Sequence, residues 1–121
     1  MKHSNEFLQI VEESRGRVNE IGVEDTLTKI AEGAVLIDVR EDNEWQAGHA
    51  RDAVHLGRGI IERDIVGLYP DKDTELILYC GGGYRSAMAA DNLQKMGYNN
   101  VFSMAGGWAA WKEAGGDVEE G

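Results

Sequence analysis

The sequence contains one cysteine and one proline, and it has no long hydrophobic run. A single cysteine excludes an internal disulfide framework, so Cys80 is either a packed core residue or a reactive thiol. No stretch approaches the roughly eighteen consecutive apolar residues of a membrane-spanning helix, and residues 1–21 lack the apolar segment of a signal peptide. We therefore expect a chain without a membrane span in the reducing environment of the cytoplasm.

Positive charge is also scarce. Lys and Arg together number 12 against 22 Asp and Glu, which makes the formal net charge -10. Proteins that bind nucleic acids through phosphate contacts carry the opposite balance, and an acidic surface disfavours anionic membranes. The composition therefore predicts neither a nucleic acid nor a membrane as partner, and an anionic ligand requires a local positive site.

Strand-like and helix-like segments alternate along the 121 residues, a length that suits one domain. Residues 34–39 and 75–79 are nearly continuous apolar runs, which is typical of parallel strands buried on both faces. Shorter strands are predicted over residues 53–56 and 101–104, and helices over residues 25–33, 42–47, 57–66, 86–96 and 108–114. This alternation predicts an α/β domain with a mostly parallel sheet.

The two ends of the chain differ from this central part. Residues 3–20 are predicted to form an amphipathic helix that ends at Gly22. Apolar side chains recur there at helical spacing: Phe7, Val11, Val18 and Ile21. The predicted organisation is a helical extension over 1–20, one α/β domain over 21–114 and an acidic flexible tail over 115–121.

A glycine-rich segment follows the strand predicted over residues 75–79. It consists of Cys80, Gly81, Gly82, Gly83, Tyr84, Arg85 and Ser86. A junction between a strand and a helix in a parallel sheet lies at the edge where open α/β sheets bind ligands. Three glycines allow successive backbone N–H groups to form a concave anion site, to which the following helix adds its N-terminus. Together with the charge of Arg85, this environment favours a thiolate at Cys80.

These residues also admit other interpretations. A lone cysteine after a buried strand is more often a packing residue, but three residues without side chains follow Cys80. The glycine-rich segment contains no nucleotide-binding motif, and the three histidines show no metal-ligand spacing with Cys80, so neither a metal nor an organic cofactor is expected. Asp38 is expected to fix a loop, and the remaining candidates are expected to be structural: His49, His55, Trp108 and Trp111.

In three segments the chain resembles the rhodanese, or thiosulfate sulfurtransferase, homology domain. These segments are 36–56, with Leu36-Ile37-Asp38-Val39-Arg40, Glu44-Trp45, Gly48-His49-Ala50 and Ala53-Val54-His55-Leu56; the loop 80–86; and Gly106-Gly107-Trp108-Ala109-Ala110-Trp111. The resemblance covers about residues 21–114. It implies a doubly wound domain with a five-stranded, mostly parallel sheet and helices on both faces. It also implies that Cys80 accepts a sulfane sulfur as a persulfide and transfers it.

The resemblance further implies the partners and the binding residues. The partners are a small-molecule sulfur donor, such as thiosulfate or a persulfide, and a thiol acceptor or a sulfur-carrying protein. The loop residues 81–86 would hold the sulfur and Arg85 the anionic donor. Family members often carry a basic residue directly after the cysteine, where this chain has Gly81. Arg58 is a candidate to replace that charge, with an ordinary surface position as the alternative.

Two other functions remain open. A cysteine-dependent phosphatase uses a similar loop, but it places five residues between its cysteine and arginine, whereas four separate Cys80 from Arg85. A non-catalytic interaction module is the other alternative, although inactive relatives usually lack the cysteine that this chain retains. The sequence therefore favours a sulfurtransferase over these two alternatives.

Overall fold

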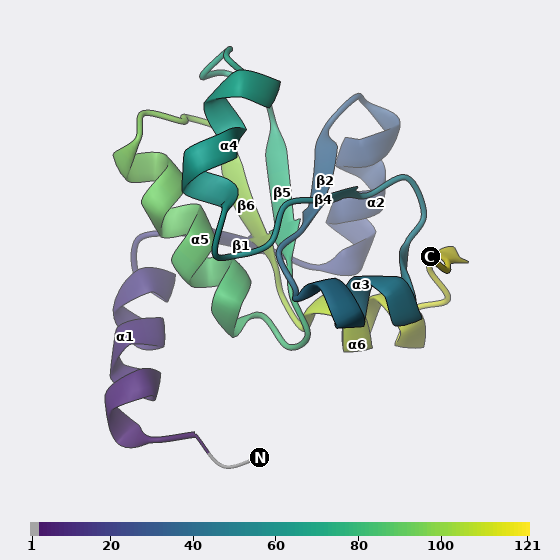
Figure 1. Ribbon diagram of the computed structural model, residues 1–121, viewed down its shortest axis with the longest axis horizontal. Coiled ribbons are helices and arrows are strands. Elements are labelled where there is room, and N and C mark those ends of the chain that lie inside the picture. Colours follow the sequence, from purple (N-terminus) through teal and green to yellow (C-terminus); the bar gives the residue numbers. More distant parts are fainter. Residues whose placement is uncertain (1–2) are drawn as a thin grey trace.

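The computed structural model describes residues 3–121 and shows a five-stranded sheet in which all strands are parallel (Figure 1). The strands lie in the order β1 (Asn19–Ile21), β6 (Val101–Met104), β5 (Leu76–Tyr79), β2 (Val35–Asp38) and β4 (Val54–His55). The two apolar runs of the sequence, β2 and β5, pair with each other in the interior of the sheet. The predicted α/β fold with a five-stranded parallel sheet is therefore confirmed.

Six helices are seen within residues 3–121, and they cover both faces of the sheet. They are α1 (Asn5–Arg15), α2 (Val23–Ala31), α3 (Asp42–Ala47), α4 (Ile61–Leu68), α5 (Tyr84–Lys95) and α6 (Gly107–Glu113). Helices α4 and α5 bury Ile61, Ile65 and Leu93 against one face, whereas α6 buries Trp111 against the other. The buried Trp111 confirms the expectation of a core aromatic.

The alternation of side chains along β5 determines on which face of the sheet the Cys80 side chain lies. Leu76 and Leu78 belong to the core beneath α4 and α5, whereas Ile77 and Tyr79 belong to the core on the opposite face. Successive side chains of a strand point to opposite faces, so Cys80 continues the first set and joins the core beneath α5. The thiol thus lies at the carboxyl end of the central strand, next to the start of α5.

The helix predicted over residues 3–20 is shorter in the structure. It ends at Arg15, and residues 19–21 form β1, which pairs with the edge of β6. Val18 and Ile21 pack against the two cores of the domain. Their separation of three residues equals the spacing of apolar residues on one face of a helix, which is why the sequence suggested a longer helix. The backbone of an edge strand finds its hydrogen-bond partners only in the tertiary structure, which explains the error. Gly22 is the N-cap of α2 rather than the end of α1.

Helix α1 packs against α5 through a buried side chain and an ion pair. Val11 is 1% exposed, and Arg17, just after the helix, donates from Nε and Nη2 to the two carboxylate oxygens of Asp91 at 2.9 and 2.7 Å. The Arg17 guanidinium holds the pKa of Asp91 below its ordinary value. These contacts attach the N-terminal segment to the helix that follows Cys80 (Figure 1).

The tail predicted as flexible contains a short strand. Residues 118–119 form β7 (Val118–Glu119), which pairs antiparallel with β3 (His49–Ala50). Trp111 supports this segment, because its indole Nε1 donates to the carbonyl of Asp117 at 2.8 Å. The pairing of β7 with β3 joins segments far apart in the sequence, so the local pattern of residues 115–121 does not indicate it. Within residues 3–121, no helix combines the length and the apolar composition needed to cross a lipid bilayer.

A buried ion pair closes the turn after β2. Asp38 is 0% exposed and accepts bonds from the backbone N–H of Arg40 at 2.8 Å and from its guanidinium Nη2 at 2.9 Å. The hydroxyl of Tyr79 donates to the same carboxylate at 2.6 Å. The Arg40 guanidinium also donates to the carbonyl of Gly48 at 2.6 Å. The expectation that Asp38 fixes a loop is confirmed.

We expect Asp38→Asn to lower the free energy of unfolding by about 3–5 kcal/mol, because it leaves the buried Arg40 guanidinium without a counter-charge. Urea unfolding followed by circular dichroism measures this change. Asp117→Asn is the matched control, since its carboxylate is 75% exposed and lies 3.8 Å from Arg51. The control should lose less than about 1 kcal/mol. Equal and small losses in both variants would contradict a stabilising role for the buried pair.

Candidate active site

The loop after β5 directs a backbone N–H at the sulfur of Cys80. The thiol is 1% exposed, and the N–H of Gly83 donates to Sγ at 3.1 Å. Gly83 is the N-cap of α5 and has a φ of 103°, a conformation that favours glycine. The left-handed turn therefore aims a backbone donor and the N-terminus of α5 at the sulfur. The sequence predicted several successive N–H groups here, of which that of Gly83 donates to Sγ.

Two buried serines continue the contacts of Cys80 into the core. The thiol lies 3.5 Å from Oγ of Ser86, and this oxygen lies 2.8 Å from Oγ of Ser103 on β6. Both serines are 0% exposed. Ser86 was among the predicted site residues, whereas Ser103 was not, because only the pairing of β5 with β6 brings it near the loop.

Arg85 is bound to a carboxylate from a different element. Its Nη1 and Nη2 donate to Oε1 and Oε2 of Glu44 on α3 at 2.7 and 3.1 Å. The hydrogen bond from Arg85 holds the pKa of Glu44 below its ordinary value, and the same bond raises the pKa of Arg85. Glu44 also accepts from the N–H of Glu41 at 3.0 Å in a capping box. The pair thus connects the cysteine loop to the first turn of α3.

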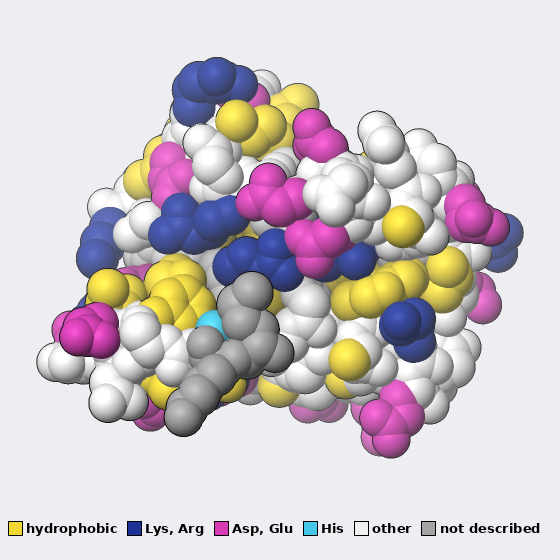
Figure 2. Space-filling view, turned by 60° about the horizontal axis from the view of Figure 1, so that its bottom comes forward, with side chains coloured by type: hydrophobic (Ala, Val, Ile, Leu, Met, Phe, Trp, Pro, Cys, Tyr) yellow, Lys and Arg dark blue, Asp and Glu magenta, His cyan; other side chains and the backbone are white. Residues whose placement is uncertain are grey.

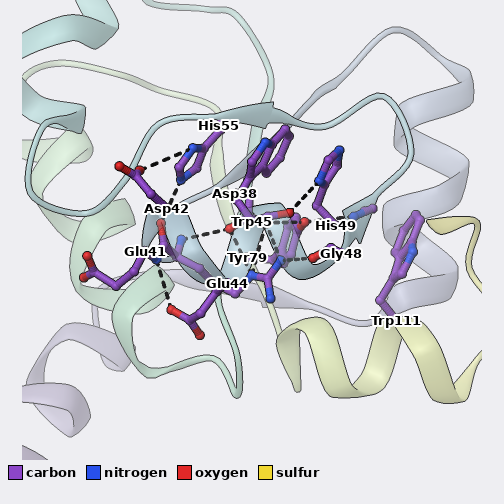
Figure 3. Close-up of polar contacts among 12 residues, drawn as sticks. Asp38, Glu41, Asp42, Glu44, Trp45, Gly48, His49, His55, Tyr79 and Trp111 are labelled. Atoms are coloured by element: carbon purple, nitrogen blue, oxygen red, sulfur yellow. Dashed lines mark hydrogen bonds and ion pairs between the residues drawn. The ribbon is translucent and has the colours of Figure 1, made fainter. Parts of the chain in front are cut away.

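Stacked rings set the position of α3 (Figure 3). The rings of Trp45 and His49 stack with centroids 3.4 Å apart, and His55 stacks on the same indole at 4.8 Å. His49 Nδ1 is 2.9 Å from the carbonyl of Trp45, and His55 Nε2 is 2.8 Å from the carbonyl of Arg40. Both histidines are therefore hydrogen-bonded structural residues, as predicted.

The start of α6 supports the loop from its other side. The N–H of Trp108 donates to the carbonyl of Cys80 at 2.7 Å. Gly107 has a φ of 53°, and a Cβ atom there would collide with the same carbonyl. This close approach explains why a glycine precedes Trp108. The segment 106–111, which the sequence analysis singled out, holds the backbone on which the thiol sits.

A pocket of about 560 Å³ opens over the sulfur. It is lined by His3, Phe7, Cys80, Gly82, Tyr84 and Arg85. The predicted loop residues thus lie together around the thiol, with Gly81, Gly83 and Ser86 forming the remainder of the loop. Phe7 and His3 were not predicted, since nothing in the local sequence indicates which surface the N-terminal helix covers.

Arg58 is not among the residues that line this pocket. Its Nη1 donates to Oε2 of Glu62 at 3.3 Å, an ion pair between the turn that precedes α4 and the first turn of that helix. The role in substrate binding that the sequence suggested for Arg58 stays a prediction.

Comparison with known proteins agrees with this geometry. The family model described as rhodanese-like domain matches residues 23–114. The thiosulfate sulfurtransferase GlpE of Pseudomonas entomophila is 35% identical over 92 residues, which are 76% of this chain and 83% of that protein. Helix α1 lies outside the family match.

Solved structures show the same fold. A protein of unknown function from Rhodopseudomonas palustris, described as a possible tyrosine phosphatase, is 26% identical with a TM-score of 0.82 over 98% of each chain. A rhodanese from E. coli, solved with anions, is 29% identical with a TM-score of 0.64 over 74% of this chain and 100% of that one. From the match over residues 23–114 and the relative at 35% identity, we conclude that the chain belongs to the rhodanese-like domain family.

Proposed function

We propose that this protein is a sulfurtransferase that carries a sulfane sulfur as a persulfide on Cys80, from a donor to a thiol acceptor. Membership of the rhodanese-like family and the similarity to a thiosulfate sulfurtransferase support sulfur transfer in general. The observation that carries the proposal is the single cysteine at the base of a pocket, with a backbone N–H directed at its sulfur.

The first half-reaction loads the sulfur. The Cys80 thiolate attacks the outer sulfur of the donor, a new S–S bond forms, and the bond to the leaving group breaks with its electron pair. With thiosulfate, the products are the Cys80 persulfide anion and sulfite, and the total charge is unchanged. The Gly83 N–H and the N-terminus of α5 stabilise negative charge at this point.

The second half-reaction returns the cysteine to its starting state. An acceptor thiol attacks the outer sulfur of the persulfide, and the S–S bond to Sγ breaks. The electron pair remains on Sγ as a thiolate, and the acceptor leaves as a persulfide that carries the proton. The cycle is covalent catalysis in two displacement steps, in which all groups come from the chain and the two substrates.

The buried serines can hydrogen-bond the Cys80 thiolate that attacks the donor. When the thiol loses its proton, the Ser86 hydroxyl can rotate to donate to Sγ, from which it lies 3.5 Å away. Ser103, 2.8 Å from Ser86, then donates to the Ser86 oxygen. A chain of two hydroxyls thus adds a hydrogen bond from the buried core to the anion.

The charge around the pocket favours an organic persulfide over thiosulfate as donor. Thiosulfate carries two negative charges, whereas the chain has a net charge of -10. Arg85 is the cation of the loop, but its guanidinium is already bound at two points by Glu44. Gly81 supplies no further charge. The positive potential at the sulfur is therefore too weak to attract a dianion strongly.

The same ion pair argues against a phosphatase. The similar protein from Rhodopseudomonas palustris is described as a possible tyrosine phosphatase. Binding a tetrahedral phosphate requires a free arginine fork, and that of Arg85 is bound to Glu44. The four residues between Cys80 and Arg85 also make a smaller ring than a phosphatase loop has. We propose sulfur transfer as the activity of this loop.

The mass of the intact protein after incubation with thiosulfate or an organic persulfide tests the proposal. We expect the gain of one sulfur atom, which a thiol removes and which Cys80→Ser does not acquire. A protein that gains no sulfur from either donor, or that hydrolyses an aryl phosphate through Cys80, would overturn the proposed function.

We expect Ser86→Ala to slow alkylation of Cys80 by iodoacetamide at neutral pH by about tenfold, because a hydrogen bond to a charged group contributes about 1.5–3 kcal/mol. The second-order rate constant from intact-mass measurements gives the result. Ser14→Ala is the control, since Ser14 is also buried but lies on α1. Equal rate constants in the two variants would show that the hydroxyl does not stabilise the thiolate.

We expect Gly81→Arg to raise kcat/KM for thiosulfate about tenfold at low salt, chiefly through a lower KM. A Cβ at Gly81 lies 3.2 Å from Nη2 of Arg85, the end of a flexible side chain that can shift. The gain should shrink as salt screens the added charge. Gly67→Arg adds the same charge on an exposed part of α4 and serves as control. If both variants behave alike, net charge rather than the pocket determines donor preference.

A further inference from the structure

The N-terminal helix forms a wall of the pocket although it lies outside the family match. His3 and Phe7 line the pocket together with Tyr84 and Cys80. Figure 2 shows hydrophobic side chains over α1 on the left of the view, beside a row of Lys and Arg side chains interspersed with Asp and Glu. A segment attached to the family domain therefore contributes directly to the space above the reactive sulfur.

Three rings form this wall. Phe7 and Tyr84 meet edge to face with centroids 6.0 Å apart, and His3 lies 5.0 Å from Phe7 and 5.1 Å from Tyr84. The guanidinium carbon of Arg15 lies 5.1 Å from the centre of the Tyr84 ring. Tyr84 is thus contacted by the helix through Phe7 and Arg15, which fixes an aromatic surface next to the cysteine loop.

The size and the charge of the pocket indicate what it accommodates. Sites for organic ligands have volumes of about 300–1,000 Å³, and this pocket of about 560 Å³ falls among them. Thiosulfate and cyanide have only five and two heavy atoms and would leave most of it empty. Arg85 lines the pocket, but its charge is compensated by Glu44. Among the described residues that line the pocket, three of six carry aromatic rings: His3, Phe7 and Tyr84.

We propose, on the basis of the function proposed above, that the physiological acceptor is a small thiol with an apolar, ring-sized organic group. That group packs against Phe7 and Tyr84 while its sulfur reaches the Cys80 persulfide. The transfer is the second half-reaction: the acceptor sulfur bonds to the outer sulfur, the bond to Sγ breaks, and the proton stays on the released organic persulfide. Helix α1 selects the acceptor, and Cys80 in the loop of residues 80–86 performs the transfer.

A single-turnover experiment isolates this step. Cys80 is loaded with sulfur from thiosulfate or polysulfide, excess donor is removed, and loss of the persulfide is followed by intact mass. The acceptors are benzyl mercaptan, the small polar thiol 2-mercaptoethanol, and cyanide. We expect benzyl mercaptan to react at least about tenfold faster than 2-mercaptoethanol at equal low concentrations, because burial of a ring favours its binding.

Variants of α1 identify the source of this preference. Phe7→Ala should lower the ratio of the benzyl mercaptan rate to the cyanide rate by about tenfold, and Phe7→Leu should retain most of it. Ile10→Ala is the matched control, because Ile10 is 55% exposed on the same helix and does not line the pocket. It should leave the ratio unchanged. Thermal unfolding of all three variants checks that α1 remains attached.

The outcomes separate this inference from the function on which it rests. If no donor loads Cys80, the proposed sulfurtransferase function is wrong, and the acceptor site with it. If Cys80 is loaded but benzyl mercaptan shows no advantage, only the acceptor class is overturned. The same holds if Phe7→Ala and Ile10→Ala give equal ratios, or if the Phe7→Ala protein unfolds at a normal temperature with an unchanged ratio.

Discussion

The buried carboxylate of Asp38 is the interaction on which the geometry of the site depends. A charge without solvent must be matched by nearby donors, and Asp38 accepts from the backbone and guanidinium of Arg40 and from the Tyr79 hydroxyl. Burial opposes the charge of Arg40, but its bonds to Asp38 raise the pKa of its guanidinium above the ordinary value. Burial and the bond to Asp38 raise the pKa of the Tyr79 hydroxyl. Both partners therefore stay in the protonation state that the network requires.

The network around Asp38 is linked to the cysteine loop through a series of direct contacts. Arg40 holds the carbonyl of Gly48 at the end of α3, and α3 carries Glu44 to Arg85 in the loop. On the other side, Trp108 holds the carbonyl of Cys80 through its backbone N–H. The loop is thus attached to two helices before any substrate arrives, and a prearranged donor at the sulfur costs little reorganisation during the reaction.

Much of this architecture follows from local sequence. Continuous apolar runs predicted β2 and β5. Glycines next to a strand predicted the loop around Cys80, because a left-handed turn such as that at Gly83 favours glycine. The ordered motifs predicted the family, which the match over residues 23–114 shows. The role of Asp38 in fixing the loop after β2 could also be predicted, because a carboxylate at the end of a buried strand has few partners besides backbone N–H groups.

Other features were decided only by the tertiary structure. The spacing of Val18 and Ile21 matched a helix, but main-chain bonds to the open edge of β6 made residues 19–21 a strand. Glu44, Ser103 and Phe7 reach the site from elements distant in the sequence, and no local pattern states which elements will be neighbours. The sequence by itself thus indicated Cys80 as the candidate nucleophile, together with the glycine-rich loop that holds it, because short-range backbone preferences favour glycine in such a turn. The wall facing that thiol arose from packing of α1 on α5, because burial of Val11 and pairing of Arg17 with Asp91 are possible only once both helices are in place.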